Sequence, residues 1–132
     1  MPHLAGVTLL VRDYDEALEY FTECLGFEVL EDVRLTPERR WVRVAPAGAR
    51  EAALLLARVA TAEQAAALGK QGGGRVAFFL HTDDFDRDYA AMRRRGVRFA
   101  EAPRDEPYGR VVVFADLYGN RWDLIQPWST GA

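Results

Sequence analysis

The sequence predicts an α+β fold in which two tandem βαβββ modules form a curved mixed sheet around a cavity. Two observations predict it. The order strand, helix, glycine and three further strands occurs twice along the 132 residues, and residues 11–15 and 25–27 align with residues 82–86 and 95–97. Self-similarity in a fixed order is the signature of a repeated structural unit. One such unit buries too little surface to be stable alone, so we expect helices on one side of the sheets and a ligand cavity on the other.

Residues 1–60 form the first predicted module. Asp13 is a plausible N-cap with Glu16 at the third helical position, which is an acidic variant of the capping box. Apolar side chains then recur at the spacing of one helical face until Gly26, where a left-handed C-cap favours glycine. The apolar and β-branched runs predict strands at residues 7–11, 27–33, 41–45 and 53–57.

Residues 61–74 are interpreted as a short helix followed by a glycine-rich linker. Thr61 and Gln64 have the spacing of a capping box, and the alanine-rich segment after them ends at Gly69. Residues 72–74 are three consecutive glycines. A glycine-rich phosphate-binding loop lies between a strand and a following helix, whereas here a strand follows, so the linker interpretation is favoured.

Residues 75–132 form the second predicted module. Residues 76–81 are an apolar strand, and a helix with Phe85, Tyr89 and Met92 on one face follows and ends at Gly96. The segment 116–120, Asp-Leu-Tyr-Gly-Asn, contains residues that tolerate positive φ and predicts a hairpin turn before the last strand. The remaining strands are predicted at residues 97–99, 110–115 and 121–126.

Composition excludes several classes of partner. The formal net charge is -3, which provides no general electrostatic basis for binding nucleic acid or an anionic membrane. The three arginines at 93–95 end a helical pattern, where cations complement the helix dipole. No apolar run approaches the roughly 20 residues that span a bilayer. A single cysteine, Cys24, excludes an intrachain disulfide and suits a reducing cytoplasm, where we expect the protein to be located.

The duplicated pattern, with VRDYDEALEYFTECLGFEV in the first half and ADLYGNRWDLIQ near the end, resembles the vicinal oxygen chelate superfamily. This superfamily comprises glyoxalase I, extradiol dioxygenases, fosfomycin resistance enzymes and bleomycin resistance proteins. The resemblance extends from about Leu4 to Pro127. It implies a homodimer and, in the metal-dependent members, a divalent metal held by His, Gln or Glu on the first and last strands of each module.

Carried over to this chain, the expected metal-ligand positions are Gly6, about Ala77, Leu54 or a neighbour, and Asp123. A divalent site needs about three protein ligands with oxygen or nitrogen donors. Asp123 is the one position of the four with such a side chain. We therefore expect the usual metal site to be largely lost and predict no cofactor, with Asp123 as the metal ligand if a metal does bind.

Asp123 and His81 are the candidate catalytic residues. Strand alternation places His81 on one face with Ala77 and Phe79, from which it could act as a base or ligand near neutral pH. Its place at a strand end also fits a capping or surface role. A buried carboxylate without a metal must be paired, hydrogen-bonded or protonated. For Asp123 the alternatives are an ion pair with Arg43, contact with a ligand cation, and acid/base chemistry.

The candidate ligand-binding residues are mostly aromatic. Four of them could line an aromatic cavity, although aromatic residues on strands are more often plain core, and Arg43 is added as a polar neighbour on a central strand. The set is Arg43, Trp41, Phe79, Tyr108 and Trp122.

Three functional hypotheses follow. The first is a protein of the drug-resistance type that binds a small organic molecule in an apolar cavity. The second is a metal-dependent lyase, isomerase or dioxygenase that uses Asp123 and His81. The third is a purely structural or interaction module, whose core would be filled. Because this fold hosts many chemistries, the choice depends on the site itself.

Overall fold

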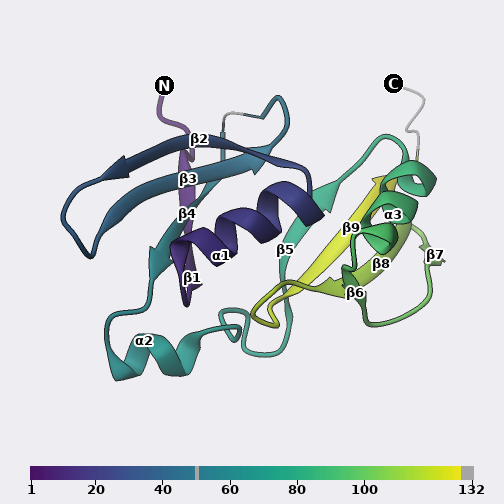
Figure 1. Cartoon of the computed structure of the whole chain (residues 1–132). Helices are drawn as coiled ribbons and strands as arrows, with labels where there is room; N and C mark the ends of the chain where they lie inside the picture. Colours follow the sequence, from purple (N-terminus) through teal and green to yellow (C-terminus); the bar gives the residue numbers. More distant parts are fainter. Residues whose placement is uncertain (50, 129–132) are drawn as a thin grey trace. The chain divides into compact units, whose positions relative to one another are not determined.

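The computed structural model describes residues 1–49 and 51–128, and the chain divides into two compact units, Met1–Leu68 and Gly69–Ala132. Each unit contains its own mixed sheet, with four strands in unit 1 and five in unit 2. The α+β class and the repeated βαβββ order are confirmed, and Figure 1 shows the elements of both units. None of the helices formed by the described residues is long and apolar enough to cross a membrane.

Unit 1 is a four-stranded sheet with the order β1-β4-β3-β2, in which β1 and β4 are parallel and the other neighbours antiparallel. Helix α1 lies across one face of it (Figure 1). Leu9, Val42 and Leu56 are buried on that face, and Tyr14, Ala17 and Phe21 of the helical segment are buried as well. The elements are β1 (Gly6–Val11), α1 (Tyr14–Glu19), β2 (Phe27–Arg34), β3 (Arg40–Pro46), β4 (Ala53–Arg58) and α2 (Ala62–Ala67).

The first helix changes its geometry partway along. It is α-helical only through Glu19, and a π-helical segment, Tyr20–Cys24, completes it before Gly26. Its start is as predicted: a carboxylate oxygen of Asp13 accepts a hydrogen bond from the Glu16 amide at 2.9 Å. Cys24 is half-buried.

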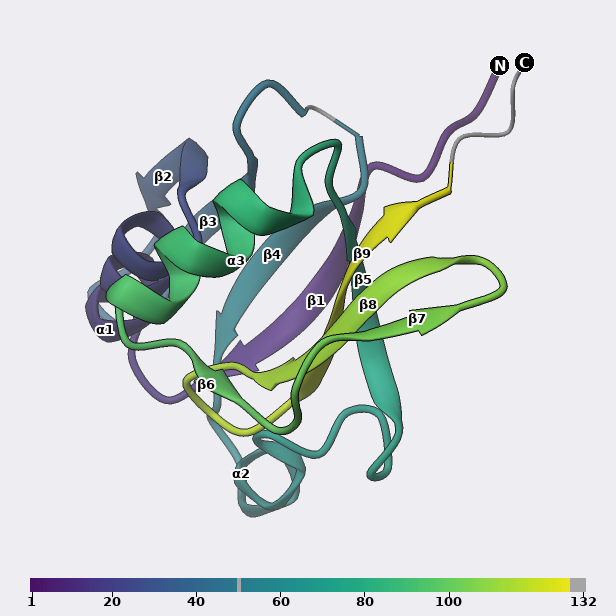
Figure 2. The ribbon, with the colours of Figure 1, turned by 90° about the vertical axis from the view of Figure 1, so that its right-hand side faces the viewer.

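Unit 2 repeats this plan and adds a strand. Its sheet has the order β5-β9-β8-β6, and β7 pairs with β8 on the same edge as β6, at the opposite end of that strand (Figure 2). Strand β7 was not predicted, because Arg-Asp-Glu has no apolar alternation. The elements are β5 (Val76–His81), α3 (Phe85–Arg94), β6 (Arg98–Phe99), β7 (Arg104–Glu106), β8 (Gly109–Ala115) and β9 (Arg121–Pro127).

The two units share the device that joins the first strand to its helix. Asp84 caps α3 as Asp13 caps α1, since its carboxylate accepts a hydrogen bond from the Arg87 amide at 3.1 Å. Gly26 and Gly96, which follow the two helices, both have positive φ, 73° and 86°. A residue with a Cβ is strained there, which explains why glycine ends each helix.

An aromatic cluster packs on one face of the sheet of unit 2. Phe78, Phe114 and Trp122 come from three neighbouring strands, and the ring centroids of adjacent members are 4.7 to 5.7 Å apart. Trp122 is only 3% exposed, and its indole N–H donates to Asp116 at 3.0 Å. The structure therefore places Trp122 in the core of unit 2, on the face covered by α3.

Candidate functional site

Asp116 organises the turn that starts the last strand. The residue is fully buried, and its two carboxylate oxygens accept hydrogen bonds of 3.0 to 3.1 Å from the Tyr118 and Asn120 amides, the Asn120 side chain and the Trp122 indole. Four donors compensate for the cost of burying the charge. This acid has a structural role in holding the hairpin of residues 116–120.

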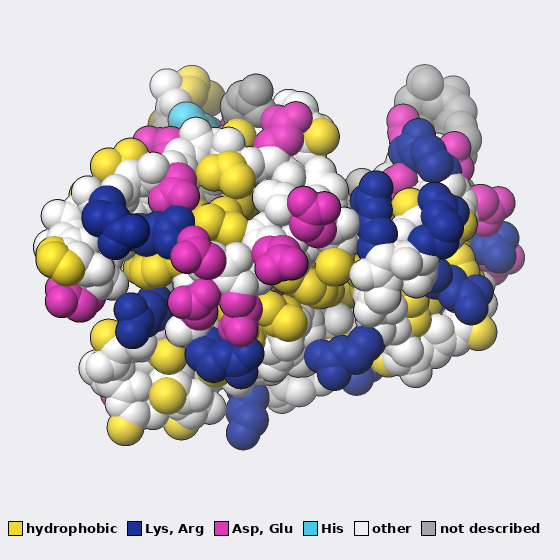
Figure 3. All heavy atoms as spheres, viewed as in Figure 1, with side chains coloured by type: hydrophobic (Ala, Val, Ile, Leu, Met, Phe, Trp, Pro, Cys, Tyr) yellow, Lys and Arg dark blue, Asp and Glu magenta, His cyan; other side chains and the backbone are white. Residues whose placement is uncertain are grey.

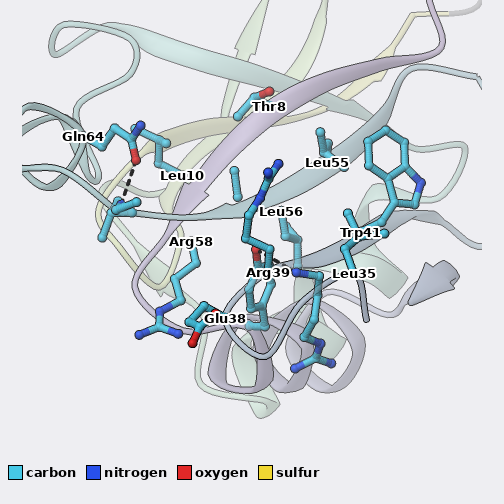
Figure 4. A pocket seen from close by; sticks show the side chains of 15 residues that line it. Thr8, Leu10, Leu35, Glu38, Arg39, Trp41, Leu55, Leu56, Arg58 and Gln64 are labelled. Carbon is cyan, nitrogen blue, oxygen red and sulfur yellow. Dashed lines mark hydrogen bonds between the residues drawn. The ribbon is translucent and has the colours of Figure 1, made fainter. Parts of the chain in front are cut away.

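The larger hollow of unit 1 opens where β3 and β4 separate. The ladder between these strands ends at the pair Val42–Leu56, although β3 begins at Arg40 and β4 continues to Arg58. The opening has a volume of about 660 Å³, which is within the usual range for small-molecule sites. Its walls come from β1, β3, β4, the loop between β2 and β3, and the start of α2. The lining residues labelled in Figure 4 include Thr8, Leu10, Leu35, Arg39, Trp41 and Leu55.

Trp41 lies between this hollow and a smaller one of about 230 Å³, and it lines both together with Thr8 and Leu55. The indole remains 41% exposed. Its N–H donates to a carboxylate oxygen of Glu31 at 3.2 Å, and that same oxygen forms a 2.6 Å ion pair with Arg43. The polar tip of the ring is therefore held in place while its apolar surface stays available.

Glu31 was missed as a site residue because it is an ordinary charged side chain on an edge strand. The register of β2 shifts between Val29 and Glu31, after which Glu31 pairs with Arg43 across the ladder. The Arg43 and Trp41 hydrogen bonds lower the pKa of Glu31 and keep it charged. The structure thus pairs Arg43 with Glu31, where the sequence left open an ion pair of Arg43 with Asp123.

Asp123 lies on the central strand β9 of unit 2, on the face opposite α3. It is 7% exposed, and its Oδ1 is buried and has no hydrogen-bond partner among the described residues. Burial raises the pKa of this carboxyl, Arg104 and Arg121 oppose that effect, and Glu101 adds to it. A buried carboxylate with an unsatisfied oxygen costs stability, and Oδ1 of Asp123 is the one buried side-chain atom of this kind among the described residues.

The other two candidates on this face are exposed. Phe79 pairs with Asp123 in the ladder between β5 and β9, and His81 pairs with Ile125 one row further along. The structure thus brings Phe79, His81 and Asp123 to one face of one sheet, although both Phe79 and His81 face solvent. Tyr108 is also exposed, in the turn that joins β7 to β8.

The metal-ligand positions implied by the resemblance do not form a donor set. Gly6 has no side chain and lines the smaller hollow, and a Cβ added there would lie 3.1 Å from the Ala53 carbonyl oxygen. Leu54 is buried on the helix-covered face, and Leu55 is the neighbour that faces the hollow. Within residues 1–49 and 51–128 there is no group of three His, Cys, Asp or Glu side chains that could hold a metal ion.

The comparisons with known proteins agree with the fold. The family model described as "Glyoxalase/Bleomycin resistance protein/Dioxygenase superfamily" matches residues 1–124. The chain belongs to this superfamily. A protein of Shewanella frigidimarina (strain NCIMB 400), named only as uncharacterized, is 47% identical over 124 residues, which are 93% of this chain and 92% of that protein.

Two crystal structures are similar over nearly their whole length. UcmS2 has a TM-score of 0.82 and 31% identity, and the match covers 95% of this chain and 98% of UcmS2. TnmS3, described as an antibiotic binding protein from Streptomyces sp. CB03234, has a TM-score of 0.76 and 30% identity, with 96% and 97% of the two chains covered. The second relative shows that this fold includes proteins described as binding antibiotics.

Proposed function

We propose that the protein binds a small organic molecule in the larger hollow of unit 1, with an apolar, preferably aromatic, part of the molecule against Trp41. The observation that carries the proposal is the exposed indole, fixed by Glu31 at the wall of an opening of about 660 Å³. Orienting a large flat side chain before the ligand arrives reduces the entropy lost on binding. The description of TnmS3 as an antibiotic binding protein supports the same class of function.

A titration with the neutral fluorescent probe phenylnaphthylamine tests this proposal. We expect saturable binding that quenches tryptophan fluorescence, and we expect Trp41→Ala to weaken the affinity by about tenfold or more, which corresponds to about 1.4 kcal/mol. Trp128→Ala is the matched control, since Trp128 is also exposed but belongs to unit 2. Absence of saturable binding, or equal affinity of the Trp41→Ala variant and the wild type, would contradict the proposal.

A metal-dependent lyase, isomerase or dioxygenase is the second candidate, and the observation that favours it is the unsatisfied carboxylate of Asp123. Nickel, zinc, manganese or iron would then raise the melting temperature, and Asp123→Ala would abolish the increase. We rank this candidate second because the donor set around the implied positions is incomplete. If none of these ions binds more tightly than about millimolar, which corresponds to about 4 kcal/mol, this candidate is excluded.

We also propose a homodimer, as the resemblance to the superfamily implies. Val29 and Val33 on the edge strand β2, together with Leu35 after it, are exposed apolar side chains that a second chain could cover. Light scattering coupled to size-exclusion chromatography gives the mass directly. A monomer mass at tens of micromolar would contradict the proposal.

A further inference from the structure

We infer that the ligand of this hollow carries a negative charge and that Arg39 binds the charged group, with Arg58 as a second cation at the same opening. The inference rests on the proposed function, because it names the class of molecule: an aromatic or otherwise apolar organic anion, such as a carboxylate, sulfonate or enolate. The inference depends on which of the charged side chains that line the hollow already have a partner of opposite charge.

Four charged side chains line the larger hollow: Glu38, Arg39, Arg40 and Arg58. Arg40 is fully engaged. Its guanidinium forms ion pairs of 2.7 Å with Asp32 and 2.8 Å with Asp15, and it lies over the Tyr14 ring. The two carboxylates occupy this guanidinium, so Arg40 is not available to a ligand.

Arg39 differs from its neighbour. Its backbone is held in the loop between β2 and β3, since its amide donates to the Thr36 hydroxyl at 3.0 Å and its carbonyl accepts from the Leu35 amide at 2.9 Å. Its guanidinium has no ion pair or side-chain hydrogen bond within the described part of the chain. Figure 4 shows the side chain extending into the hollow, toward β4 and β1.

The remaining polar groups at this opening are mainly donors. Arg58 also lines the hollow (Figure 4), and no ion pair or side-chain hydrogen bond of its guanidinium is found among the described residues. Gln64 also lines the hollow, but its side-chain oxygen already accepts the Ala60 amide at 2.7 Å, which leaves the NH₂ group for a ligand. Two unpaired guanidinium groups and an amide donor therefore face a single acid.

The charged side chains that line the hollow are three arginines and one glutamate, a set that contrasts with the composition of the whole chain. The protein carries a formal net charge of -3, and on the face of unit 1 shown in Figure 3 acidic and basic side chains lie side by side. A guanidinium presents a planar pair of donors that matches a carboxylate or sulfonate, and such charge-assisted bonds are about twice as strong as neutral ones. An anion on an apolar body therefore complements both the charge and the wall of the hollow.

A pair of probes with the same ring system tests the inference. Anilinonaphthalene sulfonate carries a sulfonate that phenylnaphthylamine lacks. We expect the wild type to bind the sulfonate about tenfold more tightly than the neutral probe at low salt, with the difference shrinking as salt screens the charges. Arg39→Gln should remove this preference and leave the affinity for the neutral probe within about twofold, and Arg39→Lys should retain part of it.

Arg94→Gln is the matched control, because Arg94 is an exposed arginine at the end of α3 in unit 2. It should change neither affinity. If both probes bind equally to the wild type, or if neither Arg39→Gln nor Arg58→Gln reduces the preference for the sulfonate, the inference is overturned while the proposed function stands. If neither probe binds saturably, the proposed function fails as well. Unchanged binding of the neutral probe by a variant also shows that its hollow is intact.

Discussion

The faces of the two sheets that the main helices leave uncovered are built differently, although one βαβββ plan produces both. In unit 1 this face contains the hollow, an exposed Trp41, and a Glu31 whose hydrogen bonds are satisfied. In unit 2 the corresponding strands carry buried Val111, Val113 and Ile125 around Asp123. The difference shows that the fold supplies a surface and that individual side chains decide whether it becomes an opening or a filled layer.

The hairpin of residues 116–120 has the largest expected effect, and it belongs to unit 2. Asp116→Ala should lower the free energy of unfolding by about 3–5 kcal/mol, because four donors, two of them on buried side chains, lose their acceptor. Urea unfolding measures this loss, and hydrogen exchange should show the amides of β8 and β9 opening before those of β1 to β4. Asp116→Asn keeps one acceptor oxygen, so the free energy of unfolding of this variant should lie between those of the wild type and Asp116→Ala. Equal loss of protection in both units would show that they unfold as one.

The contrast between the two faces can be tested directly by truncating one side chain on each. Val113→Ala should cost about 2 kcal/mol, because Val113 is buried and leaves a cavity. Leu55→Ala removes more atoms but should cost less than about 1 kcal/mol, because Leu55 already borders the hollow. Thermal unfolding of both variants gives the comparison. A larger loss for Leu55→Ala would show that the hollow is closed in solution.

Asp123 provides a prediction with a pH dependence. Because burial raises its pKa in the folded state, the folded protein binds this proton more tightly than the unfolded chain, and the charged form costs stability at neutral pH. Asp123→Asn should therefore stabilise the protein by about 1–2 kcal/mol near pH 7. The gain should decline as the pH falls through the raised pKa and vanish below the ordinary value of 3.8. Melting temperatures of the variant and the wild type measured across this pH range test the prediction. A stabilisation by Asp123→Asn that did not depend on pH would contradict a raised pKa of Asp123.

The smallest expected effect concerns the helix N-caps, which both units share. Asp13→Ala and Asp84→Ala each remove an N-cap, and each should lower the free energy of unfolding by about 1 kcal/mol. Asp13→Ser and Asp84→Ser keep a capping oxygen and should recover most of that loss. Chemical unfolding of the four variants makes the measurement. A loss at one cap alone would show that the repeat is preserved in geometry but not in energetics.

Most of the fold was accessible to sequence reasoning because it rests on local signals. The caps at Asp13 and Asp84 and the glycines at 26 and 96 satisfy local backbone requirements, and strand alternation reports which faces are buried. Strand β7 was missed because Arg104–Glu106 pairs with β8 through its backbone and shows no apolar pattern.

The candidate site was only partly accessible. Trp41 and Arg43 were singled out and lie together, but their common partner Glu31 depends on a register shift in β2 that no local pattern announces. Trp122 was considered either as a cavity-lining residue or as plain core, and alternation along β9 places it in the core of unit 2. Arg39 lies in a loop, and sequence alone provides no signal that its guanidinium extends into an opening.

By itself, the sequence determined the class, the repeat and the superfamily of this protein, because capping, glycine conformation and apolar periodicity act over a few residues. Only the tertiary structure decided where the opening lies. The hollow exists because β3 and β4 stop pairing at Val42–Leu56, and its charge depends on which arginines find carboxylates across the fold. Both depend on contacts between distant residues, so they are properties of the folded chain and not of any one segment.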